Sequence, residues 1–89
     1  MPMSKNEILK IQATIHHAMS TGTVDEVIEQ AKDKLELYKM EMMLGYGTSV
    51  SNKEFETCIE ILVQYEAMNN NIGFFKKAKL RAQLILDYS

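Results

Sequence analysis

Residues 51–68 read SNKEFETCIEILVQYEAM, and this stretch decides the fold. Ser51 followed three residues later by Glu54 is the pattern of a capping box, in which each side chain satisfies a backbone amide that a helix start leaves without a partner. Behind it, apolar residues recur at steps of three and four: Phe55, Cys58, Ile59 and Leu62. The stretch therefore predicts a helix over about residues 52–68.

Two earlier Ser/Thr–Glu pairs have the same spacing: Ser4 with Glu7, and Thr23 with Glu26. Each pair follows a residue that interrupts helices, Pro2 before the first and Gly22 before the second. Apolar residues again recur at helical steps behind each pair. We expect helices over about residues 5–19 and 24–44, with Gly45 ending the second.

The last helix has no capping box. Residues 68–71 read MNNN, and asparagine favours turns and caps because its side chain competes for nearby backbone groups. Asn70 or Asn71 is therefore expected as the N-cap of a helix over about residues 72–88, although one long helix bent at the asparagines is the alternative. The apolar stripe expected to face the core consists of Phe74, Phe75, Ala78, Ala82, Ile85 and Leu86. Leu80 and Leu84 fall on a different side.

The chain favours an all-α fold. No segment alternates polar and apolar residues in the manner of a strand, and only one proline is present. We expect a small bundle of four helices in a single domain over residues 1–89. In so short a chain, apolar burial roughly offsets the entropy lost on folding, so association that buries more apolar surface would help and we expect self-association.

Composition bears on the location of the protein. Cys58 is the only cysteine, so no disulfide can form within the chain and an oxidised secreted scaffold is not expected. The longest unbroken apolar runs are three or four residues, and no charged start precedes an apolar segment. We expect a cytoplasmic protein without a membrane span.

Residue patterns do not indicate catalysis, a cofactor or a metal. His16 and His17 are adjacent, so on a helix they point about 100° apart and do not close on one ion. Cys58 lies on the stripe expected to face the core, where a thiol acts as a small hydrophobe. The acidic side chains of the third helix are expected on a solvated face: Glu54, Glu56, Glu60 and Glu66. We expect a non-enzymatic protein with no cofactor and no metal.

Apolar faces exceed what a bundle of this size can bury. The second helix ends in a stretch with three of the seven methionines, and methionine is over-used on adaptable binding surfaces. The residues expected to bind a partner are Leu37, Met40, Met43, Leu44, Tyr46, Leu80 and Leu84. The sequence therefore predicts a protein–protein interaction protein, an adaptor, assembly chaperone or inhibitor of a larger machine, whose partner is another protein or a second copy in a homodimer.

A nucleic-acid-binding module is the alternative. The last helix is basic, with Lys76, Lys77, Lys79 and Arg81 as the possible contacts. The whole chain is acidic, with a sequence pI near 5.6, so this alternative ranks second. The acidic third helix and the basic last helix can complement each other between subunits or within one bundle.

Overall fold

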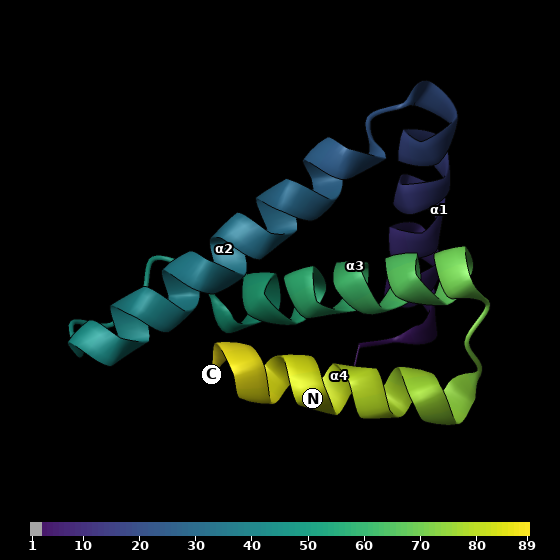
Figure 1. The fold of residues 1–89 in the computed structure, drawn as a ribbon. Coiled ribbons are helices and arrows are strands. Elements are labelled where there is room, and N and C mark those ends of the chain that lie inside the picture. Colours follow the sequence, from purple (N-terminus) through teal and green to yellow (C-terminus); the bar gives the residue numbers. More distant parts are fainter. Residues whose placement is uncertain (1–2) are drawn as a thin grey trace.

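The computed structural model describes residues 3–89 and contains helices but no strand in that range. The four helices are α1 (Lys5–Thr21), α2 (Val24–Leu44), α3 (Asn52–Asn70) and α4 (Phe74–Tyr88). The protein is a small all-α bundle of four helices, as its sequence predicts (Figure 1). Pro2, expected to precede the first helix, lies outside the described residues.

The central helix is α3. It packs against α1, α2 and α4, and α2 also contacts α1 and α4, whereas within residues 3–89 α1 and α4 do not contact each other. In Figure 1, α4 runs beside α3 at the edge of the molecule while α1 crosses behind α3. Because α3 has neighbours on several sides it carries the most buried residues, and α4, with neighbours on one side, has none.

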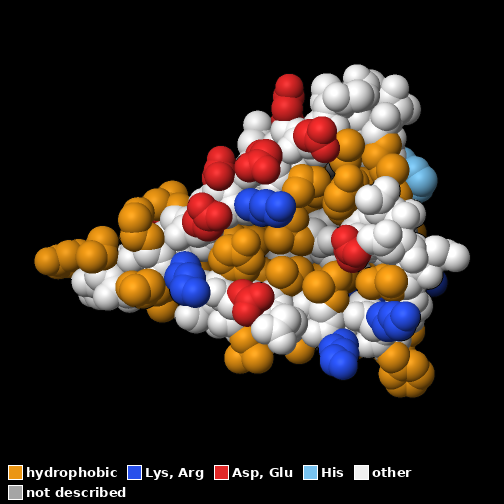
Figure 2. Space-filling view, in the orientation of Figure 1, with side chains coloured by type: hydrophobic (Ala, Val, Ile, Leu, Met, Phe, Trp, Pro, Cys, Tyr) orange, Lys and Arg blue, Asp and Glu red, His pale blue; other side chains and the backbone are white. Residues whose placement is uncertain are grey.

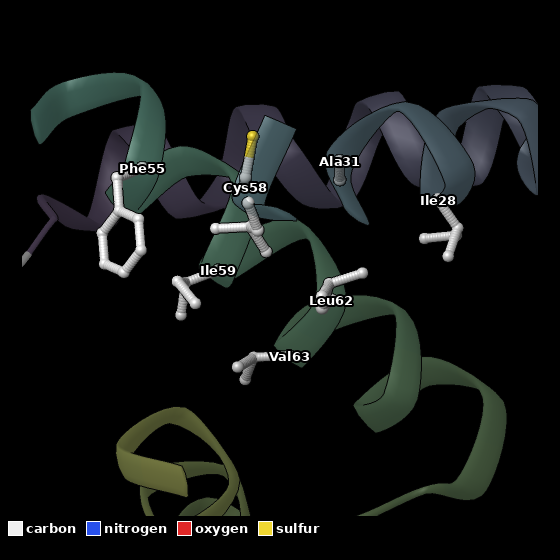
Figure 3. Close-up of a cluster of buried hydrophobic side chains, with 8 residues drawn as sticks. Ile28, Ala31, Phe55, Cys58, Ile59, Leu62 and Val63 are labelled. Atoms are coloured by element: carbon white, nitrogen blue, oxygen red, sulfur yellow. The ribbon is translucent and has the colours of Figure 1, made fainter. Parts of the chain in front are cut away.

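The main hydrophobic core lies where α2 and α3 face each other (Figure 3). Leu35 of α2 and Val63 of α3 are fully enclosed, and Ile15 of α1 is equally buried. The rings of Tyr38 and Phe55 lie 4.4 Å apart between centroids, in a tilted arrangement. The three-and-four spacing of α3 therefore points into the core, as predicted.

The capping boxes differ in how much of the pattern they form. Ser4 has both bonds, since its Oγ accepts from the Glu7 amide and Glu7 Oε1 accepts from the Ser4 amide, each at 3.2 Å. At the start of α3, the Ser51 hydroxyl also accepts from the backbone amide three residues on. At Thr23 the prediction is wrong, because its hydroxyl lies 2.9 Å from that of Thr21 and makes no cap bond. The tight connection between α1 and α2 turns this side chain back toward α1.

The asparagine segment separates two helices and excludes one bent helix. Asn71 adopts the left-handed conformation, with φ of 52°, and ends α3. Gly73 then serves as the N-cap of α4. The prediction of Asn70 or Asn71 as that N-cap is therefore wrong. Asparagine tolerates left-handed backbone, which suits the end of a helix as well as its start.

The prediction of which face of α4 packs against the core is also wrong. Leu80, Leu84 and Tyr88 are half-buried and pack against the core. The six residues predicted to face inward, Phe74 to Leu86 at helical steps, are exposed instead. Leu80 and Leu84 consequently do not form the open edge that the sequence predicts. Periodicity defines two apolar stripes on this helix, and only contacts with the other helices select which one is covered.

This reversal predicts different stabilities for two leucine substitutions in one helix. Leu84→Ala should lower the free energy of unfolding by about 1–3 kcal/mol, because it removes side-chain atoms packed on the core. Leu86→Ala, at a position 73% exposed, should change it by no more than about 0.5 kcal/mol. Urea unfolding in dilute solution, where self-association does not contribute, measures both. Equal losses would contradict the orientation of α4.

Candidate functional site

The end of α2 carries a group of exposed apolar side chains that we call the α2 tip. It consists of Met40, Met42, Met43, Leu44 and Tyr46. Met43 is 78% exposed, Leu44 61% and Tyr46 92%. Figure 2 shows these hydrophobic side chains gathered at the pointed end of the molecule, where α2 projects beyond the other helices. Leu37, one turn before this group, is also exposed, at 37%.

Glu41 holds the loop that follows the α2 tip. Its Oε1 atom accepts from the Ser49 amide at 3.0 Å, from the Ser49 hydroxyl at 2.9 Å and from the Thr48 hydroxyl at 3.2 Å. The bonds from Ser49, its amide first, lower the pKa of Glu41 below its ordinary value. Val50 is buried and anchors the far end of the loop. Tyr46 is thus displayed on a loop whose two ends are tied to the bundle.

A second apolar surface runs along α4, and we call it the outer α4 stripe. It consists of Phe74, Phe75, Ala78, Ala82, Ile85 and Leu86, all exposed. The rings of Phe74 and Phe75 meet edge to face, with centroids 5.5 Å apart. Hydrophobic side chains project along the edge of the molecule that α4 forms (Figure 2). The sequence shows this stripe, but its spacing is also that of a core face, so periodicity alone predicts it as buried.

A buried polar network joins three helices, and sequence analysis missed it. Glu60 and Gln64 of α3 are only 4% and 2% exposed. Arg81 of α4 donates to both carboxylate oxygens of Glu60, through Nε at 2.8 Å and Nη2 at 2.7 Å. Gln64 Nε2 donates to Glu60 at 2.7 Å, and Gln12 of α1 donates to Gln64 at 2.9 Å. The expectation that Glu60 lies on a solvated face is wrong.

The pKa of Glu60 reflects two opposing influences. Burial is the largest single influence and acts to raise the pKa, because a low-dielectric environment disfavours the charged form. The hydrogen bonds from Arg81 and Gln64, together with the positive charge of Arg81, outweigh burial and hold the pKa below its ordinary value of 4.5. Glu60 is therefore ionised at neutral pH. The opposite charges of the third and last helices meet within one chain.

A groove of about 510 Å³ opens between the start of α1 and α4, over α3. Its walls are mainly apolar, with Ile8, Phe55, Ile59 and Ile85 among them. Arg81 and the polar network lie at its side. The groove exists because α1 and α4 both pack on α3 without touching each other.

The basic residues of α4 do not form one cluster. Arg81 is engaged by Glu60, and Lys77 is half-buried at the groove. Lys76 and Lys79 are exposed. Of the four side chains predicted as possible nucleic-acid contacts, two therefore remain fully available to phosphates.

Residues with catalytic or ligand chemistry lie apart. His16 and His17 are both exposed on α1. Cys58 is buried, and burial raises the pKa of its thiol, which makes it a weak nucleophile. Within residues 3–89, no three His, Cys, Asp or Glu side chains come together as metal ligands could.

The described residues define a small helical bundle with two exposed apolar surfaces and an ion pair whose carboxylate, that of Glu60, is buried. Within residues 3–89, no helix combines the length and the apolar character needed to cross a membrane. Comparisons with protein-family models, curated proteins and solved structures find no match to this chain. The function is therefore argued from the surfaces themselves.

The buried ion pair predicts an unequal response to two substitutions. Arg81→Met should lower the free energy of unfolding by about 2–4 kcal/mol at neutral pH, because it leaves the Glu60 carboxylate buried without its cation. Replacing both residues, Glu60→Met with Arg81→Met, should recover most of this loss. Chemical unfolding of the three proteins measures both effects. A double variant as unstable as the single one would contradict the account.

Lowering the pH should change the contribution of Glu60 to stability in opposite directions in the wild type and in Arg81→Met. Since the folded pKa of Glu60 lies below 4.5, its contribution is present at neutral pH and is lost as pH falls through that folded pKa. In Arg81→Met, burial without the cation raises the pKa of Glu60, so protonation relieves the penalty. The stability gap between the two proteins should shrink from about pH 7 to about pH 4. Glu60→Gln is the control: in proteins that carry it, the effect of Arg81→Met should not change with pH, because the titrating group is absent. A stability gap between the wild type and Arg81→Met that stays constant with pH would exclude Glu60 as the source of the gap.

Proposed function

We propose that this protein is a non-enzymatic protein–protein interaction protein, an adaptor, assembly chaperone or inhibitor of a larger machine. The observation that carries the proposal is the α2 tip, five large apolar side chains exposed together at one end of the molecule. Contiguous apolar surface at the end of a projecting helix is typical of an interaction site.

The chemistry of the α2 tip suits an apolar pocket or groove on a partner. Methionine side chains are flexible and polarizable, so Met40, Met42 and Met43 can adapt to the partner's surface. Tyr46 adds an aromatic ring with a hydroxyl at its end, the kind of side chain enriched in binding hot spots. Fully burying each such side chain contributes about 1.5–3 kcal/mol before the costs of association.

The held loop supports binding in a second way. Because Glu41 ties Thr48 and Ser49 to the helix, the loop that carries Tyr46 is held at its far end before any partner arrives. A restrained surface loses less conformational freedom on association. The free thiol of Cys58 is compatible with a reducing compartment, and we propose that the protein works in the cytoplasm.

Charged substitutions at the α2 tip test the proposal. The test uses the triple variant Met43→Glu, Leu44→Glu, Tyr46→Glu, immobilised in the same way as the wild type. It should retain at least tenfold less of each protein that the wild type retains from native lysate. The reason is that burying each carboxylate in an apolar contact is costly. Quantitative mass spectrometry of the retained proteins measures the reduction.

Leu9→Glu is the matched control, because Leu9 is 51% exposed on α1, outside the α2 tip. It should leave retention unchanged, and circular dichroism should show all variants folded. Retention by the triple variant equal to that of the wild type, or no protein retained by the wild type, would exclude the α2 tip as a binding surface.

A further inference from the structure

The outer α4 stripe has a symmetric sequence pattern. Two large side chains stand at positions 74 and 75, a small one at 78, a small one at 82, and two large ones at 85 and 86. These positions lie six, five and two residues before position 80 and two, five and six residues after it. Reading the stripe in either direction therefore gives the same order of large and small side chains.

From this pattern we infer that the outer α4 stripe binds the same stripe of a second copy of this chain, with the two helices antiparallel about a two-fold axis at the level of position 80. The inference rests on the proposed function in one respect, that exposed apolar helix faces of this protein are binding surfaces. Ala78 then lies opposite the partner subunit's Ala82. Phe74 lies opposite the partner subunit's Leu86, and Phe75 opposite the partner subunit's Ile85.

The sizes of the side chains suit this pairing. Alanines at the centre allow two helix axes to approach to about 8 Å, the short end of the usual range. The aromatic and aliphatic side chains at the two ends then fill the space on either side of the alanine contact. A parallel pair matches any sequence with itself, so it makes no use of a symmetric pattern. It would also align the two helix dipoles unfavourably, whereas an antiparallel pair opposes them.

The stripe is accessible and of useful size. Phe74 is 76% exposed and Phe75 85%, so with aliphatic neighbours the stripe presents on the order of 500 Å² of apolar surface. A standard interface buries about 800 Å² on each partner. Ile8 of the adjoining groove lies on the same side as Phe74 and Ile85 and can supply part of the remainder. All six side chains of the stripe are exposed in the described bundle.

The effect of salt on binding distinguishes a second copy of this chain from an acidic partner helix or a nucleic acid on the same surface. Lys79 borders the stripe, and the two-fold axis brings it near the partner subunit's Lys79 at the rim. Salt screens this repulsion, so the homodimer should tighten as ionic strength rises. An acidic partner helix or a nucleic acid on the same lysines would bind more weakly at high salt.

Disulfide trapping tests the antiparallel register. Ala78→Cys and an epitope-tagged Ala82→Cys protein are mixed and mildly oxidised, and the mixed disulfide should form at least tenfold faster than either symmetric one. In the antiparallel pair, equal positions are displaced by four residues, about 6 Å along the helix, whereas positions 78 and 82 are level. Wild type is the control, because Cys58 is buried. Faster symmetric disulfides, or no disulfide, would overturn the inference.

Sedimentation equilibrium tests the dimer itself. Wild type should be dimeric, with a dissociation constant that falls between about 50 mM and about 500 mM salt. Phe75→Glu should raise the dissociation constant at least 100-fold, and Leu9→Glu, the matched control, should leave it unchanged. A monomeric wild type, or a dimer weakened by salt, would overturn the pairing.

The two proposals fail separately. The α2-tip triple variant should remain a dimer, because its substitutions lie outside α4. If the wild type is a monomer but retains a protein that the α2-tip variant does not retain, only the α4 pairing is overturned. A dimer that retains no protein would overturn only the role of the α2 tip.

Discussion

The buried carboxylate of Glu60 is the constraint on which the rest of the structure depends. A charge that is only 4% exposed must find donors, because an isolated ion in a low-dielectric interior is strongly unfavourable. Arg81 and Gln64 supply those donors, and Gln12 extends the network to α1. One carboxylate thereby connects the three helices α1, α3 and α4. Helix α2 is joined instead by apolar packing on α3.

The same ion pair governs which face of α4 is exposed. Since α4 contributes no buried residue, its rotation depends on a few directional contacts, chiefly Arg81 with Glu60 and the bond from Lys39 to the Asp87 carbonyl. With Arg81 turned toward α3, Leu80 and Leu84 settle against the core. The phenylalanines and Leu86 are left outside. The exposure of the apolar stripe of α4 therefore follows from the rotation of the helix that Arg81, Leu80 and Leu84 together define.

Much of the secondary structure was predictable, and parts of the candidate site were not. Glycine in left-handed backbone ends α1 at Gly22 and α2 at Gly45, as local chemistry predicts. The exposed methionines at the end of α2 followed from an excess of apolar faces over what so small a bundle can bury. The core face of α4 did not follow, because both of its stripes have helical spacing. Glu60 looked like any other acidic surface residue until its neighbours in space were known.

The sequence by itself determined that this chain is helical, where its helices begin and end to within a few residues, and that it has more apolar faces than it can bury. These properties depend on caps, turns and periodicity, which act over about one helical turn. Only the tertiary structure decided which faces are covered and that Glu60 is paired across helices. Those outcomes depend on contacts between residues far apart in the chain, such as positions 60 and 81, which no local pattern encodes.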